Sequence, residues 1–161
     1  MNSETGQPGK KLAFEDFEVG DTRSLGSKTV TAEEIIEFAE EFDPQPMHLN
    51  EKAGSASLLG GLAASGWHVC SIAMRMICDG YIVNSTSQGA PGVEYVKWRR
   101  PVLAGDTLSG TTTIISKRRS NSRPNLGFII VEHTLTNQRG ETVTEMRNTG
   151  MFLLREPEAE A

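Results

Sequence analysis

The feature that most constrains the fold is a continuous apolar segment, WHVCSIAMRMIC, at residues 67–78. Its apolar side chains would occupy nearly every face of a helix, which is typical of a helix buried in a protein core. The segment is too short for a membrane span of ~20 residues. We therefore expect a central helix surrounded by a sheet, with Gly80 as its C-cap.

Strand-like runs rich in Thr, Val and Ile supply the sheet. One precedes the helix at 21–30, and four follow it at 93–100, 106–117, 127–136 and 141–154. Breaks at Gly105-Asp106, at SNSRPN (120–125) and at NQRG (137–140) are hairpin signals, which predict antiparallel pairing of consecutive strands. A buried helix with an antiparallel sheet predicts an α+β fold.

A second, amphipathic helix is predicted at residues 32–42, where Thr31 and Glu34 form a capping-box pattern. Pro44 and Pro46 disfavour helical geometry in the residues before them, so the helix ends at the segment DPQPMH. A short helical stretch is expected near 51–55.

The 161 residues fit one domain, predicted at 13–155 between polar tails at 1–12 and 156–161. A net charge of -5 and a pI near 5.3 argue against a nucleic-acid partner. The amino-terminal decapeptide lacks the apolar stretch of a signal peptide, and no run is long enough for a membrane helix. A cytoplasmic location is expected.

The cysteines and histidines do not suggest a metal site or a disulfide. Cys70 and Cys78 are separated by roughly 12 Å on one helix, which is too far for a disulfide. With only three scattered histidines, no metal site is expected. His68 is interpreted as a hydrogen-bonded core residue or one that supports the site, and His133 as a hydrogen-bonded residue of the sheet.

Three separated motifs carry a family resemblance: FDPQPMHLNE (42–51), GGLAASGWH (60–68) and WRRPVLAGDTL (98–108). Together they resemble the MaoC-like dehydratases, over roughly residues 14 to 154. The resemblance implies a hot-dog fold, a homodimer and an R-specific hydratase acting on an enoyl thioester of coenzyme A. Coenzyme A enters as part of the substrate, and no separate cofactor is implied.

The resemblance also assigns roles to individual residues. It implies that Asp43 and His48 are the catalytic acid/base pair and that the Gly66 N–H contacts the thioester oxygen. Gln45 and Ser65 stand where the family commonly has Asn and His.

Further substrate contacts are expected from residues around the motifs and from basic groups that could meet the phosphates of coenzyme A. The expected substrate-binding residues are Gln45, Ser65, Trp67, Arg99 and Arg118. Lys97, Arg100, Lys117, Arg119 and Arg123 are weaker candidates.

Three alternatives stay open. Asp43 could merely end a helix while His48 lies on a surface loop. A hot-dog thioesterase would hydrolyse the same kind of substrate, although the helix at 67–78 contains no Asp or Glu of the kind such enzymes use. A non-catalytic acyl-thioester binding protein would keep the fold without the chemistry. Ser65 lacks the pattern of a nucleophile elbow and is a candidate helix N-cap.

Overall fold

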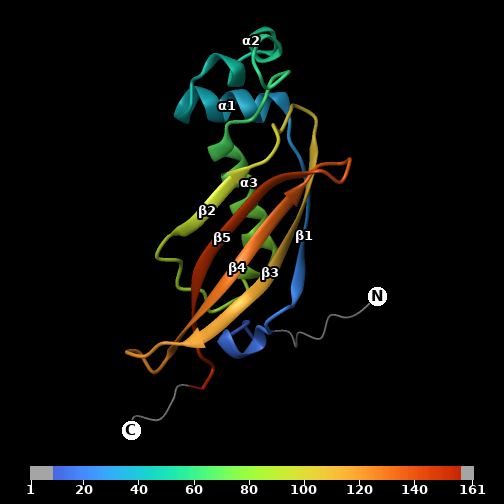
Figure 1. Cartoon of the computed structure of the whole chain (residues 1–161). Coiled ribbons are helices and arrows are strands. Elements are labelled where there is room, and N and C mark those ends of the chain that lie inside the picture. The colour runs from blue at the N-terminus through green and yellow to red at the C-terminus, as the bar shows by residue number, and fades with distance from the viewer. Residues whose placement is uncertain (1–8, 157–161) are drawn as a thin grey trace.

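The computed structural model describes residues 9–156, so most of the two predicted tails, residues 1–8 and 157–161, lies outside the described residues. Figure 1 shows a long curved sheet with one helix on its concave side and two helices across one end. The helical elements are η1 (Phe14–Asp16), α1 (Ala32–Phe42), η2 (Pro46–His48), α2 (Glu51–Ala56), α3 (Gly66–Ile77) and η3 (Cys78–Ile82). The strands are β1 (Thr22–Thr29), β2 (Val93–Trp98), β3 (Thr107–Arg119), β4 (Leu126–Thr136) and β5 (Thr142–Leu153).

The five strands form one antiparallel sheet in the order β1-β3-β4-β5-β2. The hairpins β3–β4 and β4–β5 confirm two of the three predicted turns. The prediction that β2 pairs with the next strand is wrong, because β2 lies on the far edge beside β5. β1 and β2 are therefore the two edge strands.

The segment between β2 and β3 explains why no hairpin forms there. It pairs instead with the residues that precede α3: Ala64 N–H donates to Val102 O, and Ala104 N–H donates to Leu62 O. Gly105 then turns the chain with a φ of 89°. These bonds carry the chain across the end of the sheet, so β3 begins on the other side of the helix.

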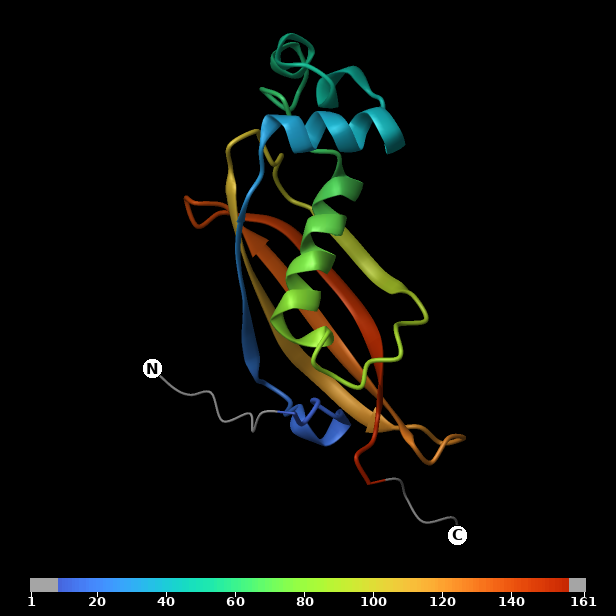
Figure 2. The ribbon, with the colours of Figure 1, turned by 180° about the vertical axis from the view of Figure 1, so that it is seen from behind.

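Helix α3 lies along the concave face of the sheet (Figure 2). Val69, Ala73 and Met76 are buried there. The sheet does not surround the helix, however, because Trp67 is 62% and Met74 48% exposed on its outer side. The prediction of a helix buried on every face is thus wrong for the single chain.

The end of the central helix also differs from the prediction. Gly80 does not cap it; the chain continues beyond Ile77 as a π-helical turn, η3. Tyr81 in this turn is buried and packs against Phe17 with ring centroids 6.0 Å apart. Burial of the Tyr81 ring stabilises a longer helical segment than local capping signals predict.

Helix α1 is bounded as predicted. Thr31 Oγ1 accepts the Glu34 N–H, and Glu34 accepts the Thr31 N–H, which together form the capping box. Its apolar residues Ile35 and Ala39 are buried. α1 and α2 lie across the amino-terminal end of α3, and this arrangement brings the DPQPMH segment to that end of the helix (Figures 1 and 2).

Candidate active site

The DPQPMH segment bends where its prolines require it. Asp43 is the C-cap of α1, with φ -149° and ψ 69°. Pro46 then begins the short 3-10 helix η2, whose last residue is His48. Proline fixes φ and suits the first position of a helical turn. This turn buries His48, which is only 6% exposed and does not lie on an open surface loop.

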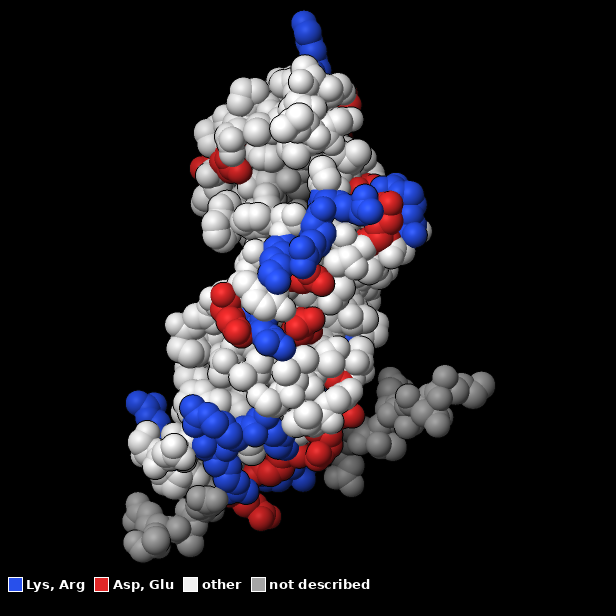
Figure 3. All heavy atoms as spheres, viewed as in Figure 1, with Lys and Arg blue, Asp and Glu red and all other residues white. Residues whose placement is uncertain are grey.

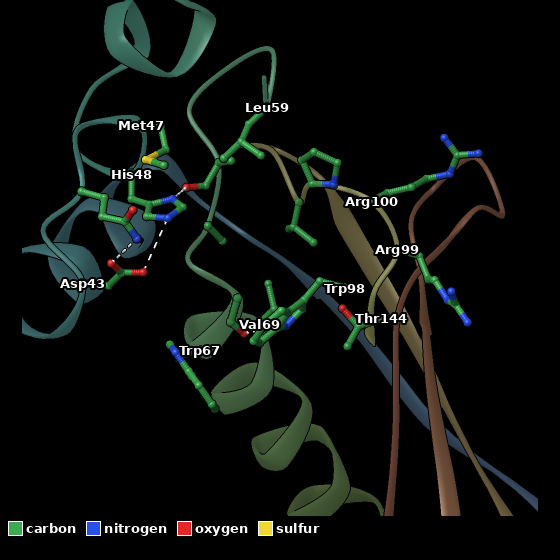
Figure 4. A pocket seen from close by; sticks show the side chains of 16 residues that line it. Asp43, Met47, His48, Leu59, Trp67, Val69, Trp98, Arg99, Arg100 and Thr144 are labelled. Atoms are coloured by element: carbon green, nitrogen blue, oxygen red, sulfur yellow. Dashed lines mark hydrogen bonds and ion pairs between the residues drawn. The ribbon is translucent and has the colours of Figure 1, made fainter. Parts of the chain in front are cut away.

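Asp43 and His48 face each other across this bend (Figure 4). Asp43 Oδ2 lies 3.6 Å from His48 Nε2. His48 Nδ1 lies 2.7 Å from the carbonyl oxygen of Ala63, which can only accept a hydrogen bond, so Nδ1 carries the proton. In the neutral ring, Nε2 therefore has a free lone pair directed toward Asp43.

Two further side chains fix the Asp43 carboxylate. Ser65 Oγ donates to Oδ2 at 2.6 Å, and Gln45 Nε2 donates to Oδ1 at 2.8 Å. The Ser65 hydrogen bond, followed by the Gln45 hydrogen bond, lowers the pKa of Asp43 below its usual value, and the nearby His48 adds to this effect. The carboxylate is consequently ionised at neutral pH.

The amino terminus of α3 forms the next part of the site. Ser65 is the N-cap, as expected, and its Oγ accepts the Trp67 N–H at 3.3 Å. Gly66 is the first residue of the helix, and among residues 9–156 its N–H has no hydrogen-bond partner. Such free N–H groups and the helix dipole favour a negative charge.

Trp98 explains why residue 66 is a glycine. Its indole N–H donates to Gly66 O at 3.1 Å, and a Cβ at residue 66 would lie 2.5 Å from Trp98 Cε2. No larger residue fits without moving the indole. Trp98 also packs edge-on against Trp67, with centroids 5.5 Å apart.

These residues border a cavity of about 410 Å³ between α3, β2 and the 58–64 loop (Figure 4). Six of the eight predicted site residues line it: Asp43, Gln45, His48, Gly66, Trp67 and Arg99. The Arg99 guanidinium pairs with Glu145 at 2.6 Å. Ser65 is fully buried behind the wall and acts through Asp43.

The structure does not bring Arg118 to this cavity. Arg118 lies near the last residues of β3, at the end of the sheet opposite α1, with its guanidinium 4.5 Å from the centre of the Phe128 ring. Lys117 is likewise occupied, because its ammonium group donates to the carbonyl oxygens of Phe14 and Phe17. Figure 3 shows basic side chains gathered at this end of the sheet with acidic side chains beside them, away from the cavity.

Sequence reasoning missed two participants. Trp98, which ends the β2 run, packs on Gly66, and the Ala63 carbonyl sets the His48 tautomer. Trp98 belongs to the recognised WRRP motif, so its aromatic side chain was an available signal. The Ala63 contribution comes from the backbone and has no sequence signal.

The other two histidines have different environments. His133 is hydrogen-bonded to Thr112 and Asn148, as predicted for a residue of the sheet. His68 stacks on Phe38 with ring centroids 4.8 Å apart, but its buried Nδ1 has no partner within residues 9–156. The expected hydrogen bond of His68 is therefore not formed at Nδ1.

Within the described part of the chain, no group of three or more His, Cys, Asp or Glu side chains is arranged to hold a metal ion. Over the same residues, none of the helices combines the length and apolar character that crossing a membrane requires.

Comparison with known proteins places this geometry in a family. A family profile described as "MaoC like domain" matches residues 16–135. The chain is 27% identical over 135 residues to YdeM, an uncharacterized protein of Bacillus subtilis, covering 83% of this chain and 94% of YdeM. It is 38% identical over 69 residues to a mesaconyl-CoA hydratase of Haloarcula hispanica, which spans 42% of this chain and 19% of that protein.

Solved structures agree with this match. The MaoC-like dehydratase of Rhodospirillum rubrum superimposes with a TM-score of 0.81 at 36% identity, over 90% of this chain and 99% of that one. A double hot-dog protein of Mycobacterium tuberculosis gives a TM-score of 0.71 at 15% identity, over 94% of this chain and 46% of that one. The α+β hot-dog fold expected from the sequence is confirmed.

Proposed function

Because the chain belongs to the MaoC-like family of hydratases and dehydratases, we propose that it adds water to a trans-2-enoyl thioester of coenzyme A, giving the (R)-3-hydroxyacyl thioester. The observation that carries this proposal is the approach of Asp43 Oδ2 to His48 Nε2 on the cavity wall. Hydration needs a group that activates water, a proton for C2 and a donor for the thioester oxygen.

Asp43 and His48 meet the first two requirements. Asp43 is ionised and His48 Nε2 lies beside its Oδ2, so a water molecule that lies against both atoms can give a proton to one of them. The oxygen of that water is then oriented to attack C3. One of the two groups takes the proton as the oxygen–C3 bond forms, and the pair returns a proton to C2.

The thioester oxygen needs the third group. As the C2=C3 electron pair moves toward the thioester, negative charge develops on its oxygen, and the enolate is stabilised by a hydrogen-bond donor. The Gly66 N–H at the amino terminus of α3 is the donor that we assign to this role. Loss of one such donor typically costs roughly 3 to 4 kcal/mol of transition-state stabilisation.

The remaining lining residues suit the carrier portion of the substrate. Trp67 and Trp98 offer partly exposed aromatic faces beside Arg99 and Arg100. Aromatic rings and guanidinium groups bind purine rings and phosphates, which coenzyme A contains. The similarity to a mesaconyl-CoA hydratase supports a coenzyme A thioester as the substrate. No separate cofactor is part of the proposal.

One assay distinguishes the hydratase from its two rivals. The purified protein should bleach the enoyl-thioester absorbance of short trans-2-enoyl-CoA substrates without releasing free thiol, and the product should be the R enantiomer. Thiol release would support a hot-dog thioesterase instead. Binding of the substrate with unchanged absorbance would support a non-catalytic binding protein.

Asp43→Asn is the decisive variant. It keeps the shape of the side chain and removes the negative charge, so we expect the hydration rate to fall about 100- to 10,000-fold. Asp79→Asn is the matched control, because Asp79 is an exposed carboxylate paired with Arg75 away from the cavity. Hydration that survives in Asp43→Asn would contradict the assigned role.

A further inference from the structure

A second cavity, of about 350 Å³, continues the candidate active site along α3. Trp67 lines both cavities. Trp98 on β2 and Thr144 on β5 line the first cavity. Val96 and Met146, each two residues away on the same strand, line the second cavity. Since Trp98 pairs with Thr144 and Val96 with Met146, the four side chains lie on one face of the sheet, and the two cavities adjoin there as one groove region between α3, β2 and β5, with Trp67 at their junction.

The walls of this second cavity are mainly apolar, including Met74, Ile77 and Phe152. His133 and Asn148 interrupt them. Polar groups in an apolar wall cost free energy unless they are hydrogen-bonded or serve a ligand. The hydrogen bonds of this pair therefore indicate which polar atoms are left for a ligand.

His133 fixes the orientation of the Asn148 carboxamide. His133 Nε2 lies 3.0 Å from Asn148 Oδ1, so Nε2 donates and the amide oxygen is occupied. His133 Nδ1, at 2.8 Å, accepts from the Thr112 hydroxyl. Burial lowers the pKa of His133 to about 4, so the ring is neutral at physiological pH.

The other end of the carboxamide is free. Within residues 9–156, the Asn148 NH₂ group has no hydrogen-bond partner, although Asn148 lines the cavity. The Ser87 hydroxyl, which lies beside Phe152 farther along β5, also lines the cavity and accepts the Gly89 N–H. Among residues 9–156, no acceptor pairs with either donor, so each can donate to an oxygen of a ligand.

We propose that this groove holds the acyl group of the substrate and that Asn148 binds an oxygen acceptor on the distal part of it. The inference rests on the proposed hydratase function and names its substrate class: an enoyl thioester whose chain carries a hydroxyl or carboxyl group. Thr144 and Asn148 are four residues apart on β5, or about 14 Å, which places the acceptor well beyond the reacting double bond. His133 is a positioning residue in this arrangement.

The test compares matched substrates on the full-length protein. Three series of trans-2-enoyl-CoA with about eight to fourteen carbons are used, ending in a methyl, a hydroxyl or a carboxyl group, because the chain must span about 14 Å to reach Asn148. At the best chain length, we expect kcat/KM about 10-fold or more higher for an oxygenated substrate than for its alkyl counterpart. The hydroxyl and carboxyl series distinguish a neutral from an anionic acceptor.

Two variants test the role of Asn148. Asn148→Leu should lower kcat/KM for the oxygenated chain to the level of its alkyl counterpart, so that the preference is lost. Asn148→Asp keeps the acceptor for His133 but replaces the NH₂ with an anionic oxygen. This oxygen repels a carboxylate, so kcat/KM should fall most for the carboxyl series. If Asn148 had only a structural role, both substitutions would lower kcat/KM for all three series alike.

Failure of this inference and failure of the proposed function give different results. Hydration of alkyl chains with no preference for oxygen, or a preference unchanged in Asn148→Leu, would overturn this inference alone. No hydration of any series would overturn the proposed function and this inference with it.

Discussion

At the scale of single residues, the two positions that depart from the common family pattern both act on the same carboxylate. Gln45 and Ser65 each donate a hydrogen bond to Asp43. They therefore strengthen its ionised state and fix its orientation toward His48. The two residues thus give the carboxylate the kind of hydrogen-bonded support that a catalytic pair needs.

Removal of the Ser65 hydroxyl should raise the pKa of Asp43. The Ser65 hydrogen bond is the largest cause of the lowered pKa, so Ser65→Ala lets the carboxylate take a proton at higher pH than in the wild type. The Asp43 side-chain ¹³C shift, followed by NMR as the pH falls, reports this directly. Loss of the helix N-cap should also cost about 1 kcal/mol of stability.

Ser71→Ala is the control for this measurement. Ser71 lies on the same helix, and its hydroxyl donates to the Trp67 carbonyl, away from Asp43. The Asp43 titration should be unchanged in this variant. An Asp43 pKa that does not rise in Ser65→Ala would show that this hydrogen bond is not what holds the carboxylate ionised.

The sequence predicted the Asp43 and His48 pair because both lie in one recognisable motif. It did not predict that Ser65 would reach Asp43, because 22 residues separate them and only the packing of α1 across the start of α3 joins them. Trp98 meets Gly66 for the same kind of reason, through contacts distant in sequence. A local sequence pattern does not reveal a role that depends on contacts between residues far apart in the chain.

At the scale of elements, the helices and most strands followed from periodicity and turn residues. α1 has the predicted bounds, 32–42, because its capping box and the prolines act locally. The pairing of β2 with β5 did not follow, because a turn signal at Gly105 cannot tell a hairpin from a crossover. Likewise, Gly80 is a local stop signal that the burial of Tyr81 overrides.

The buried His133, which is hydrogen-bonded to Asn148 in the sheet, makes the stability of the fold depend on pH. Burial holds the pKa of His133 at about 4, against a usual value of 6.5. As the pH falls from 6.5 toward 4, the unfolded chain binds a proton that the folded chain does not, so stability is lost over this window. Between pH 7 and 4.5 this loss amounts to roughly 2 to 3 kcal/mol.

Urea unfolding of the wild type and of His133→Gln at both pH values measures this effect. The variant should be less stable at pH 7, but its free energy of unfolding should decrease by roughly 2 to 3 kcal/mol less on acidification. Other titrating groups act equally in both proteins and cancel in the difference. Identical losses in the two proteins would show that His133 does not carry this dependence.

At the scale of the whole molecule, the single chain leaves an apolar strip uncovered. Trp67 and Met74 on α3 and Val93 on the edge strand β2 are each about half or more exposed. All three line the open side of the cavity beside Asn148. An apolar strip next to an unpaired strand edge is a surface that natural proteins cover.

We expect a second copy of the chain to cover this strip, giving a homodimer of twice 17.5 kDa. Sedimentation at micromolar concentration measures the mass. Met74→Glu should shift the protein toward monomer, because a charge would be buried at the interface, whereas at an exposed site of a monomer it would change stability by less than about 0.5 kcal/mol. Leu58→Glu, at a fully exposed leucine beyond α2, is the control and should remain dimeric. A monomeric wild type, or a Met74→Glu variant as dimeric as the control, would contradict the expectation, because the strip would then face water without a partner copy.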